Sequence, residues 1–440
     1  MSIKVQQTSS KLVGPIYNGD EQPPPATNQF APLSVFDWYI LPDEHVPVIY
    51  AFKAPTPSNA FLEQGLGKVL SEYRVWAGRL GKDENNHIII LLNDKGVRFI
   101  EASADRTLEQ VTPFSQPNLL TLHPDFDGMK EILIIQLTRF TCGSLVISFS
   151  SNHMVADGFS VSQFLVSWGR VCRGLDISPR PLHNREIFVP RNPCRIEFDH
   201  QSLEFTKGVI NEEFIDPSNI PPYSEEDVIY HKLHFPIELI AKLKSKAGYS
   251  VSGKPYTTFE SLVAHLWKTI TKVRRLACQT TEIKIAVNGR RRLIPRVPDE
   301  YFGNLVLCAY PVAKVKELTN GTLSNTASII HESVVSLNDD YFKSYIDFVS
   351  NDMQGENPMP ERGERTLVAL WPNLEFDSWL GFPFNEVDFG SGKPFLFMPS
   401  FDSLEGLVYL VPSIDGGVDV YLCLFKQQMA FFEEICYSID

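Results

Sequence analysis

Apolar residues recur along this chain with two spacings, one typical of strands and one typical of helices. Short alternating or continuous apolar runs predict strands at residues 47–52, 87–92, 97–101, 132–140, 144–150, 228–235, 283–287, 305–310, 407–411 and 418–423, after a short candidate around 3–5. Apolar residues three and four positions apart predict helices at 61–73, 161–171, 236–247, 258–274 and 321–337. Strands and helices alternate throughout, so the pattern predicts a mixed α/β fold.

The periodic pattern fades between about residue 175 and residue 222, where prolines accumulate. A stretch of this length without its own elements is uncommon inside one compact domain. We therefore expect an N-terminal half at 1–180, a crossover linker at 181–222 and a C-terminal half at 223–440.

Composition narrows the class of protein. Of the 440 residues, 43% are hydrophobic and 12% aromatic, which is enough to build sizeable cores. The net charge of −13 disfavours nucleic acid and anionic membranes as partners and mildly favours cationic ligands. The seven cysteines contain no CxxC pair and predict neither a zinc site nor a disulfide framework. The polar N-terminus contains no signal-peptide pattern and no apolar run is long enough to span a membrane, so we expect a cytoplasmic protein. We also expect a monomer.

His153 is the first candidate for chemistry. It follows the apolar run Leu145–Phe149 and precedes a helix that begins near Val161, so it lies where a strand ends and a helix has not yet begun. An imidazole titrates near neutral pH, which suits a general base. Asp157, four residues later, either orients the imidazole or anchors the turn. The pattern is also compatible with a purely structural histidine.

A second motif, Asp388-Phe389-Gly390-Ser391-Gly392, favours the catalytic role of His153 over the structural one. Together with His153-Met154-Val155-Ala156-Asp157, it resembles the paired HxxxD and DFGWG motifs of the plant BAHD acyl-CoA-dependent acyltransferases. The resemblance extends over essentially the whole chain, through further blocks in the family's order: Leu33-Ser34 with Asp37, Ala77-Gly78-Arg79-Leu80, Thr258-Phe259-Glu260 with Ala264-His265-Leu266-Trp267, Asn288-Gly289-Arg290 and Tyr301-Phe302-Gly303-Asn304.

Ser391 departs from the family pattern, which has Trp at this position. In this respect the chain looks like the group that acylates amines, including the agmatine hydroxycinnamoyltransferases. The segment Asn373–Trp379 also resembles that group.

The resemblance implies two similar halves with a chloramphenicol-acetyltransferase-like mixed sheet in each and a channel between them. It implies His153 at the middle of the channel and acyl-CoA as co-substrate, with no bound cofactor or metal. The acceptor would attack the thioester directly, and CoA would leave as a thiolate. Asp157, Asp388 and Gly390 are then expected to be structural. Arg290 is the expected partner of Asp157, of Asp388 or of both, and as a buried pair it would be costly to break.

The remaining site residues concern the two substrates. Glu375 and Asp377 precede Trp379, where the family builds its acceptor pocket, and two carboxylates would suit a guanidinium or amine. A solvated acidic loop is the alternative. Trp379 is expected to stabilise the oxyanion or to form a wall, and His45 and Trp38 to line a pocket or the core. Thr257 and Thr258 start a helix, where they would meet CoA or simply cap the helix.

We therefore predict a hydroxycinnamoyl-CoA:amine N-acyltransferase, with p-coumaroyl-CoA as donor and agmatine as the leading acceptor. Putrescine and tryptamine are alternative acceptors, and an O-acyltransferase for alcohols is a rival that Glu375 and Asp377 disfavour. A catalytically silent binding protein on the same scaffold is a second rival. A metal hydrolase is disfavoured because the histidines are dispersed and form no HExxH pair.

Overall fold

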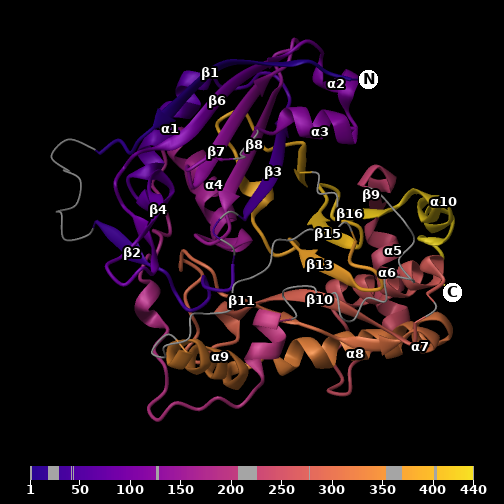
Figure 1. The fold of residues 1–440 in the computed structure, drawn as a ribbon. Helices are drawn as coiled ribbons and strands as arrows, with labels where there is room; N and C mark the ends of the chain where they lie inside the picture. Colours follow the sequence, from indigo (N-terminus) through magenta and orange to yellow (C-terminus); the bar gives the residue numbers. More distant parts are fainter. Residues whose placement is uncertain are drawn as a thin grey trace. The chain divides into compact units, whose positions relative to one another are not determined.

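The computed structural model describes residues 2–17, 29–40, 42, 44–124, 128–206, 225–276, 278–352, 369–400 and 404–439. Within them the chain forms two compact units that alternate along the sequence (Figure 1). Unit 1 comprises Met1–Val189, Pro298–Leu305 and Gly381–Phe401. Unit 2 comprises Pro190–Val297, Val306–Leu380 and Asp402–Asp440.

These units differ from the predicted halves at 1–180 and 223–440, because the chain returns to unit 1 twice after residue 297. Hydrogen bonds and strand pairing attach both returning segments to the N-terminal sheet and to its following turn. The predicted crossover linker at 181–222 does not form one separate segment. Residues 190–206 belong to unit 2, and residues 207–222 lie outside the described residues.

Unit 1 is built on a six-stranded mixed sheet. In spatial order its strands are β1 (Val5–Val13), β6 (Val97–Ala104), β7 (Leu133–Arg139), β8 (Leu145–Asn152), β3 (His45–Phe52) and β14 (Leu396–Pro399). Strands β6 and β7 are parallel and the other neighbours antiparallel, so the strands predicted at 132–140 and 144–150 form a hairpin of β7 and β8. A separate three-stranded sheet contains β2 (Phe30–Pro32), β5 (Ile88–Leu91) and β4 (Arg79–Lys82).

Side chains alternate along β8, so the two faces of this sheet pack against different elements. Phe149 packs its ring against Trp76 and against Phe164 of α4 (Gly158–Cys172). Ser148, on the opposite face, donates to the Leu122 carbonyl of α3 (Gln116–Leu122). Helix α1 (Asn59–Leu70) lies beside α4, where the Trp168 indole donates to the Leu62 carbonyl, and α2 (Leu108–Val111) is a single turn. The end of β8 is thus held by packing on both sides.

Unit 2 contains a seven-stranded mixed sheet. In order its strands are β11 (Val306–Ala309), β10 (Thr280–Asn288), β13 (Leu374–Ser378), β15 (Leu407–Pro412), β16 (Val418–Phe425) and β9 (Val228–Phe235), with β12 (Val312–Lys314) also paired to β10. The β10–β13 and β13–β15 pairs are parallel, and the other pairs are antiparallel. The described helices of this unit are α5 (Ile237–Ala247), α6 (Thr258–Arg274), α7 (Val315–Asn320), α8 (Leu323–Ser336), α9 (Asp339–Asp352) and α10 (Lys426–Ile435).

The two faces of the unit 2 sheet differ in chemistry. One face is apolar, and its Phe235 contacts His265 of the buried helix α6. The other face carries charged and tyrosine side chains that neighbour one another across the strands, and we call it the polar face: Lys284, Glu375, Asp377, Tyr409, Tyr421 and Lys232. Because residues two apart share a face, the alternating sequence of β13 places Glu375 and Asp377 together.

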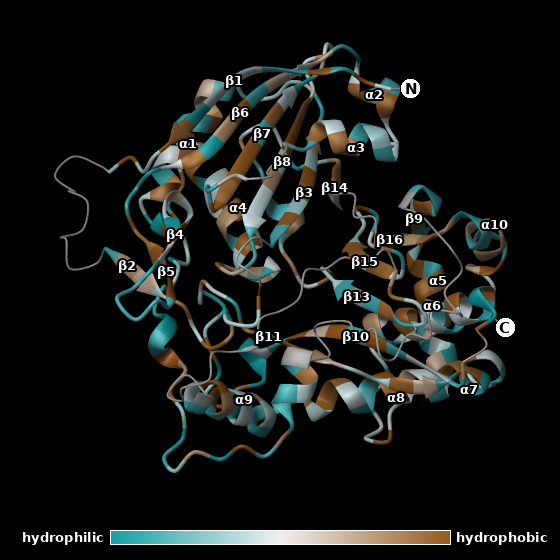
Figure 2. Ribbon diagram, in the orientation of Figure 1, coloured by the Kyte–Doolittle hydropathy of each residue, from teal (hydrophilic) through white to brown (hydrophobic). Residues whose placement is uncertain are grey.

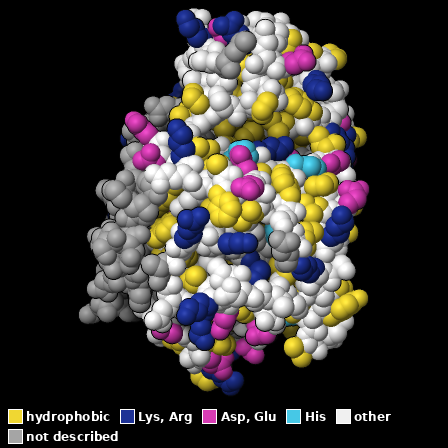
Figure 3. Space-filling view, turned by 90° about the vertical axis from the view of Figure 1, so that its right-hand side faces the viewer, with side chains coloured by type: hydrophobic (Ala, Val, Ile, Leu, Met, Phe, Trp, Pro, Cys, Tyr) yellow, Lys and Arg dark blue, Asp and Glu magenta, His cyan; other side chains and the backbone are white. Residues whose placement is uncertain are grey.

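Every strand and helix predicted from periodicity is present, with ends shifted by a few residues, although β1 extends from Val5 to Val13. The mixed α/β class is confirmed. Figure 2 shows the central strands β7 and β15 as predominantly hydrophobic. In Figure 3, acidic and basic side chains are interspersed, so the acidic excess does not gather on that face. No helix in the described part of the chain combines the length and apolarity needed to cross a lipid bilayer.

A buried ion pair holds the start of β13, the strand that carries Glu375 and Asp377. Arg274, at the end of α6, lies 2.6 Å from Glu405, and their side chains are 1% and 0% exposed. The same guanidinium donates to the carbonyls of Pro372 and Asn373 at 3.1 and 2.9 Å. Burial raises the pKa of Glu405, and the nearby Arg274 opposes that rise. The pair therefore stabilises the structure only while both partners are present.

We predict that Glu405→Ala lowers the free energy of unfolding by about 3–5 kcal/mol, because it leaves the Arg274 charge buried without its carboxylate. Thermal or urea unfolding would measure the loss. The control is Glu317→Ala, which breaks the Lys314–Glu317 pair, whose side chains are 71% and 56% exposed. Equal midpoints for the two variants would contradict the assigned role of Glu405.

Candidate active site

His153 lies in the turn between β8 and α4, as the sequence predicted. Its backbone N–H donates to the Glu44 carbonyl at 2.8 Å, which joins the turn to the start of β3. The side chain is half-buried, and Nδ1 has no hydrogen-bond partner within the described residues. No described carboxylate therefore orients this imidazole through Nδ1, as a catalytic triad would require.

Asp157 acts on the backbone rather than on the imidazole. It is the N-cap of α4, where Oδ1 accepts from the Ser160 N–H at 2.9 Å. Its Oδ2 accepts from the Leu305 N–H at 3.0 Å. Ser160 adds hydrogen bonds from Oγ to the carbonyls of Tyr301 and Gly303 at 3.2 and 2.9 Å. These contacts fasten residues 301–305 to the beginning of α4, which fits the structural role expected for Asp157.

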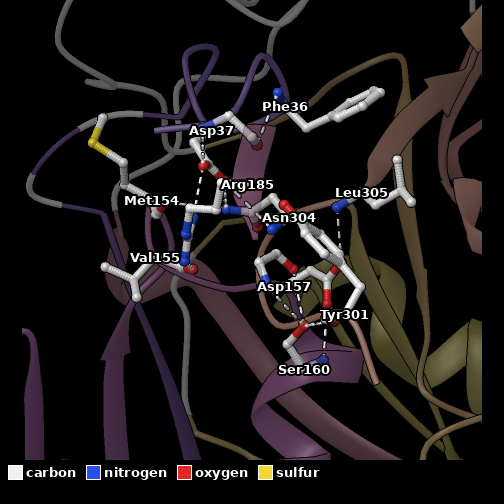
Figure 4. A network of polar contacts seen from close by, with 12 residues as sticks. Phe36, Asp37, Met154, Val155, Asp157, Ser160, Arg185, Tyr301, Asn304 and Leu305 are labelled. Carbon is white, nitrogen blue, oxygen red and sulfur yellow. Dashed lines mark hydrogen bonds and ion pairs between the residues drawn. The ribbon is translucent and has the colours of Figure 1, made fainter. Parts of the chain in front are cut away.

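A second set of buried polar groups holds the turn from the other side (Figure 4). Asn304 donates through Nδ2 to the carbonyls of His153 and Met154 at 2.9 and 3.2 Å. Arg185 donates to the Val155 carbonyl at 2.5 Å. Asp37 joins the two, because it accepts from Arg185 at 2.7 Å and from Asn304 at 2.8 Å.

This set holds the main chain of the turn that carries His153. Three successive carbonyls, those of residues 153, 154 and 155, receive hydrogen bonds from side chains fixed elsewhere in unit 1. The Asp37 and Arg185 side chains are 0% and 1% exposed, so water does not compete for these contacts. The sequence analysis noted the blocks containing Asp37 and Asn304 without assigning them a role. It missed Arg185, because nothing in the local sequence indicates its distant partners.

The DFGSG segment is a structural loop that packs on α4. The Asp388 carboxylate accepts from the backbone N–H groups of Gly390 and Gly392 at 2.8 and 2.9 Å. Both glycines have positive φ, 100° and 96°, a conformation that other residues rarely adopt. Phe389 packs its ring 4.7 Å from that of Trp168. Ser391, where the family pattern has Trp, is exposed.

Asp388 forms an ion pair with Arg173, at 3.5 Å. Arg173 is the C-cap of α4, the helix on which the loop packs. Arg290 is fully buried, and its backbone N–H donates to the Asn288 side chain at 3.0 Å. Pairing of Arg290 with Asp157, with Asp388 or with both stays a prediction.

The predicted acceptor residues of unit 2 lie on one strand. Glu375 and Asp377 are half-buried on β13, and Trp379, 7% exposed, directly follows that strand. Lys284 of β10 forms an ion pair with Glu375 at 2.8 Å, so the positive charge that Glu375 was expected to receive from a substrate is already supplied by the protein. The sequence analysis missed this lysine, because strand register alone brings it to Glu375.

A buried thiol lies among these charges without being a nucleophile. Burial raises the pKa of Cys308 to about 12, with the carboxylates of Glu375 and Asp377 adding to the rise and Lys284 opposing it. The thiol therefore stays protonated near neutral pH and is not activated. This agrees with a mechanism that needs no covalent intermediate on cysteine.

The other predicted residues divide between the two units. In unit 1, strand pairing places His45 opposite Asn152, next to His153 in sequence, and Trp38 is half-buried with its ring 6.1 Å from that of His87. In unit 2, Thr257 is the N-cap of α6 and exchanges hydrogen bonds with Glu260, and Thr258 begins the helix. Capping accounts for Thr257, and the CoA contact predicted for both threonines stays a prediction.

Among the described residues, no group of three or more His, Cys, Asp or Glu side chains is arranged to hold a metal ion. The described residues offer a half-buried imidazole on a hydrogen-bonded turn in unit 1 and a charged sheet face in unit 2.

We predict that Asp157→Ala lowers the free energy of unfolding by about 1–3 kcal/mol, because two backbone N–H groups lose their acceptor. Asp157→Asn retains an oxygen for the helix cap, so it should lose less than half as much. Urea unfolding of both variants would measure this. If Asn were as damaging as Ala, then the charge of Asp157, and not its capping oxygen, would be what matters.

Comparisons with known proteins assign the chain to a family. A model described as the transferase family matches residues 4–438. The chain is 44% identical to agmatine hydroxycinnamoyltransferase 1 of Oryza sativa subsp. japonica over 99% of both chains. It is 42% identical to agmatine coumaroyltransferase-1 of Hordeum vulgare and 40% identical to putrescine hydroxycinnamoyltransferase 3 of Oryza sativa subsp. japonica, each over 100% of both chains.

Among solved structures, F. sporotrichioides TRI101 complexed with coenzyme A and T-2 shares the fold, with a TM-score of 0.72 at 20% identity over 92% of this chain and 97% of that one. The family model and the full-length relatives agree with the motif resemblance. The chain belongs to the transferase family, that of the BAHD acyl-CoA-dependent acyltransferases.

Proposed function

We propose that this acyltransferase moves a hydroxycinnamoyl group, p-coumaroyl first, from CoA to agmatine. The observation that carries the proposal is full-length similarity to two agmatine-acylating relatives, at 44% and 42% identity. The acidic residues Glu375 and Asp377 on β13 support a cationic acceptor. Putrescine is the second candidate acceptor, because a putrescine-acylating relative is 40% identical over its whole length.

We propose His153 as the general base of the reaction. The neutral amine attacks the thioester carbonyl, so that a C–N bond forms and the C–S bond breaks. The imidazole takes the proton that the nitrogen loses, and CoA leaves as a thiolate that this proton can then neutralise. The His153 main chain donates to the Glu44 carbonyl and accepts from the Asn304 side chain, and these two bonds fix the backbone that carries the imidazole. Trp379 is proposed to donate its indole N–H to the oxyanion.

We also propose that the enzyme is a cytoplasmic monomer that needs no metal or bound cofactor, with acyl-CoA as its co-substrate. Its partners are small molecules, and neither nucleic acid nor a membrane is required. None of the seven cysteines forms a disulfide within the described residues, which supports a reducing compartment.

We predict that His153→Ala folds normally and loses at least about a hundredfold of kcat, the range of general-base contributions. A thiol-release assay with p-coumaroyl-CoA against agmatine, putrescine, tryptamine and shikimate would measure it and rank the acceptors. Asp157→Asn is the control and should retain most of the turnover. Near-normal rates in His153→Ala would overturn the base assignment, and faster turnover of shikimate than of any amine would favour the O-acyltransferase.

We predict that Asp377→Asn raises the agmatine KM about tenfold or more while the KM for p-coumaroyl-CoA changes little, because a hydrogen bond to a charged group is lost. Glu375→Gln should have the smaller effect, because Lys284 already balances the charge of Glu375. Steady-state kinetics of both variants would test this. Equal changes in the two KM values would remove the carboxylates from the acceptor site.

A further inference from the structure

The polar face of the unit 2 sheet contains a row of side chains that the proposed reaction does not yet use. Strand register places Asp377 of β13, Tyr409 of β15 and Tyr421 of β16 directly beside one another. Neighbouring strands are about 4.8 Å apart, so Tyr409 lies between a carboxylate on one side and a phenol on the other. This inference rests on the proposed function, because it concerns how the far end of the acceptor is held.

Tyr421 is the unusual member of the row. Its side chain is 1% exposed, yet its hydroxyl has no hydrogen-bond partner within the described residues. Buried hydroxyls nearly always have a partner, and an unsatisfied one costs about 1–3 kcal/mol. A buried phenol of this kind points to a polar group that arrives from outside the protein.

The ring of Tyr421 is fixed by its neighbours on β9. The Tyr230 ring stacks on it with centroids 5.8 Å apart, and the Lys232 ammonium lies 5.7 Å from its centroid. The Lys232 charge is balanced by Asp419 at 2.7 Å. Burial raises the pKa of Tyr421 well above its usual value, so the hydroxyl stays neutral and its oxygen can accept a hydrogen bond.

Tyr409 supplies a surface for a flat cation. It is only half-buried, and the Trp379 ring lies 5.1 Å from its own ring. Ala286, an exposed residue on the neighbouring strand β10, leaves room on the other side of Asp377. A guanidinium can stack on an aromatic ring and has N–H donors along several directions in its plane. A simple ammonium gains less from a ring and has no plane to stack.

We propose that Asp377, Tyr409 and Tyr421 form the subsite for the guanidinium of the acceptor. The guanidinium stacks on Tyr409, donates to the Asp377 carboxylate on one side and donates to the Tyr421 hydroxyl on the other. The subsite therefore selects agmatine over putrescine, because both amines carry a reacting primary amine but only agmatine carries a guanidinium.

The test compares Tyr421→Phe with Tyr341→Phe, each in the full-length enzyme. Tyr341 is a buried tyrosine of the same unit whose hydroxyl donates to Glu204 at 2.6 Å. Tyr421→Phe should raise the agmatine KM about tenfold, change the KM for p-coumaroyl-CoA and for putrescine by less than about twofold, and leave the melting temperature unchanged. Tyr341→Phe should lower the melting temperature and leave the agmatine KM unchanged, because it loses a bond within the protein.

A second pair of variants tests the stacking surface. Tyr409→Phe retains the ring and should retain agmatine affinity, whereas Tyr409→Leu should weaken it about tenfold and reduce the preference for agmatine over putrescine. Calorimetric binding of agmatine to each variant measures affinity without turnover.

The outcomes separate the two proposals. If the wild-type enzyme acylates agmatine but Tyr421→Phe and Tyr409→Leu bind it as tightly as wild type, the subsite is wrong and the function stands. If the wild-type enzyme binds agmatine and both variants lose affinity, the subsite stands even where another amine is turned over faster. If the wild-type enzyme neither binds nor acylates agmatine, both proposals fall.

Discussion

The buried contact between Asp37, Arg185 and Asn304 is the constraint on which the turn that carries His153 depends. Arg185 and Asn304 donate to three successive carbonyls, those of residues 153, 154 and 155, and Asp37 fixes both donors. A buried charge pair is costly to desolvate, and removing one partner leaves the other charge uncompensated. These contacts restrain the main chain of the turn, while Nδ1 of His153 has no hydrogen-bond partner within the described residues.

In this arrangement the aspartate of the HxxxD motif has a structural role. In a catalytic triad the acid acts on the histidine, whereas here Asp157 caps α4 and binds the Leu305 N–H. The motif spacing is therefore a requirement of the strand–turn–helix geometry: four residues separate the end of β8 from the cap of α4. The Asp388 carboxylate plays a comparable role, because it folds its own loop around Gly390 and Gly392. Each of these two carboxylates accepts hydrogen bonds from backbone N–H groups.

In unit 2 the charged and aromatic side chains of the polar face are held in place by other residues of the protein. Lys284 neutralises Glu375, the buried pair of Arg274 and Glu405 holds the start of β13, and the rings around Tyr421 fix its hydroxyl. A surface that is already oriented loses little conformational entropy when a substrate binds. The chemistry of this face, with carboxylates beside aromatic rings, fits a flat cation better than a neutral alcohol. This agrees with the agmatine-acylating relatives.

The amino-acid sequence was enough to predict the strands and helices with strong periodicity, the mixed α/β class, the family, and the position of His153 between β8 and α4. These follow from local spacing and from motifs that are continuous in the chain. Three-dimensional contacts were needed to show that residues 298–305 and 381–401 belong to unit 1, that Arg173 pairs with Asp388, and that Lys284 reaches Glu375. They also revealed Arg185 and the row through Tyr409 and Tyr421. Those contacts join residues far apart in sequence through sheet register and buried hydrogen bonds. A one-residue shift of register would move Lys284, Tyr409 or Tyr421 to the opposite face of its sheet.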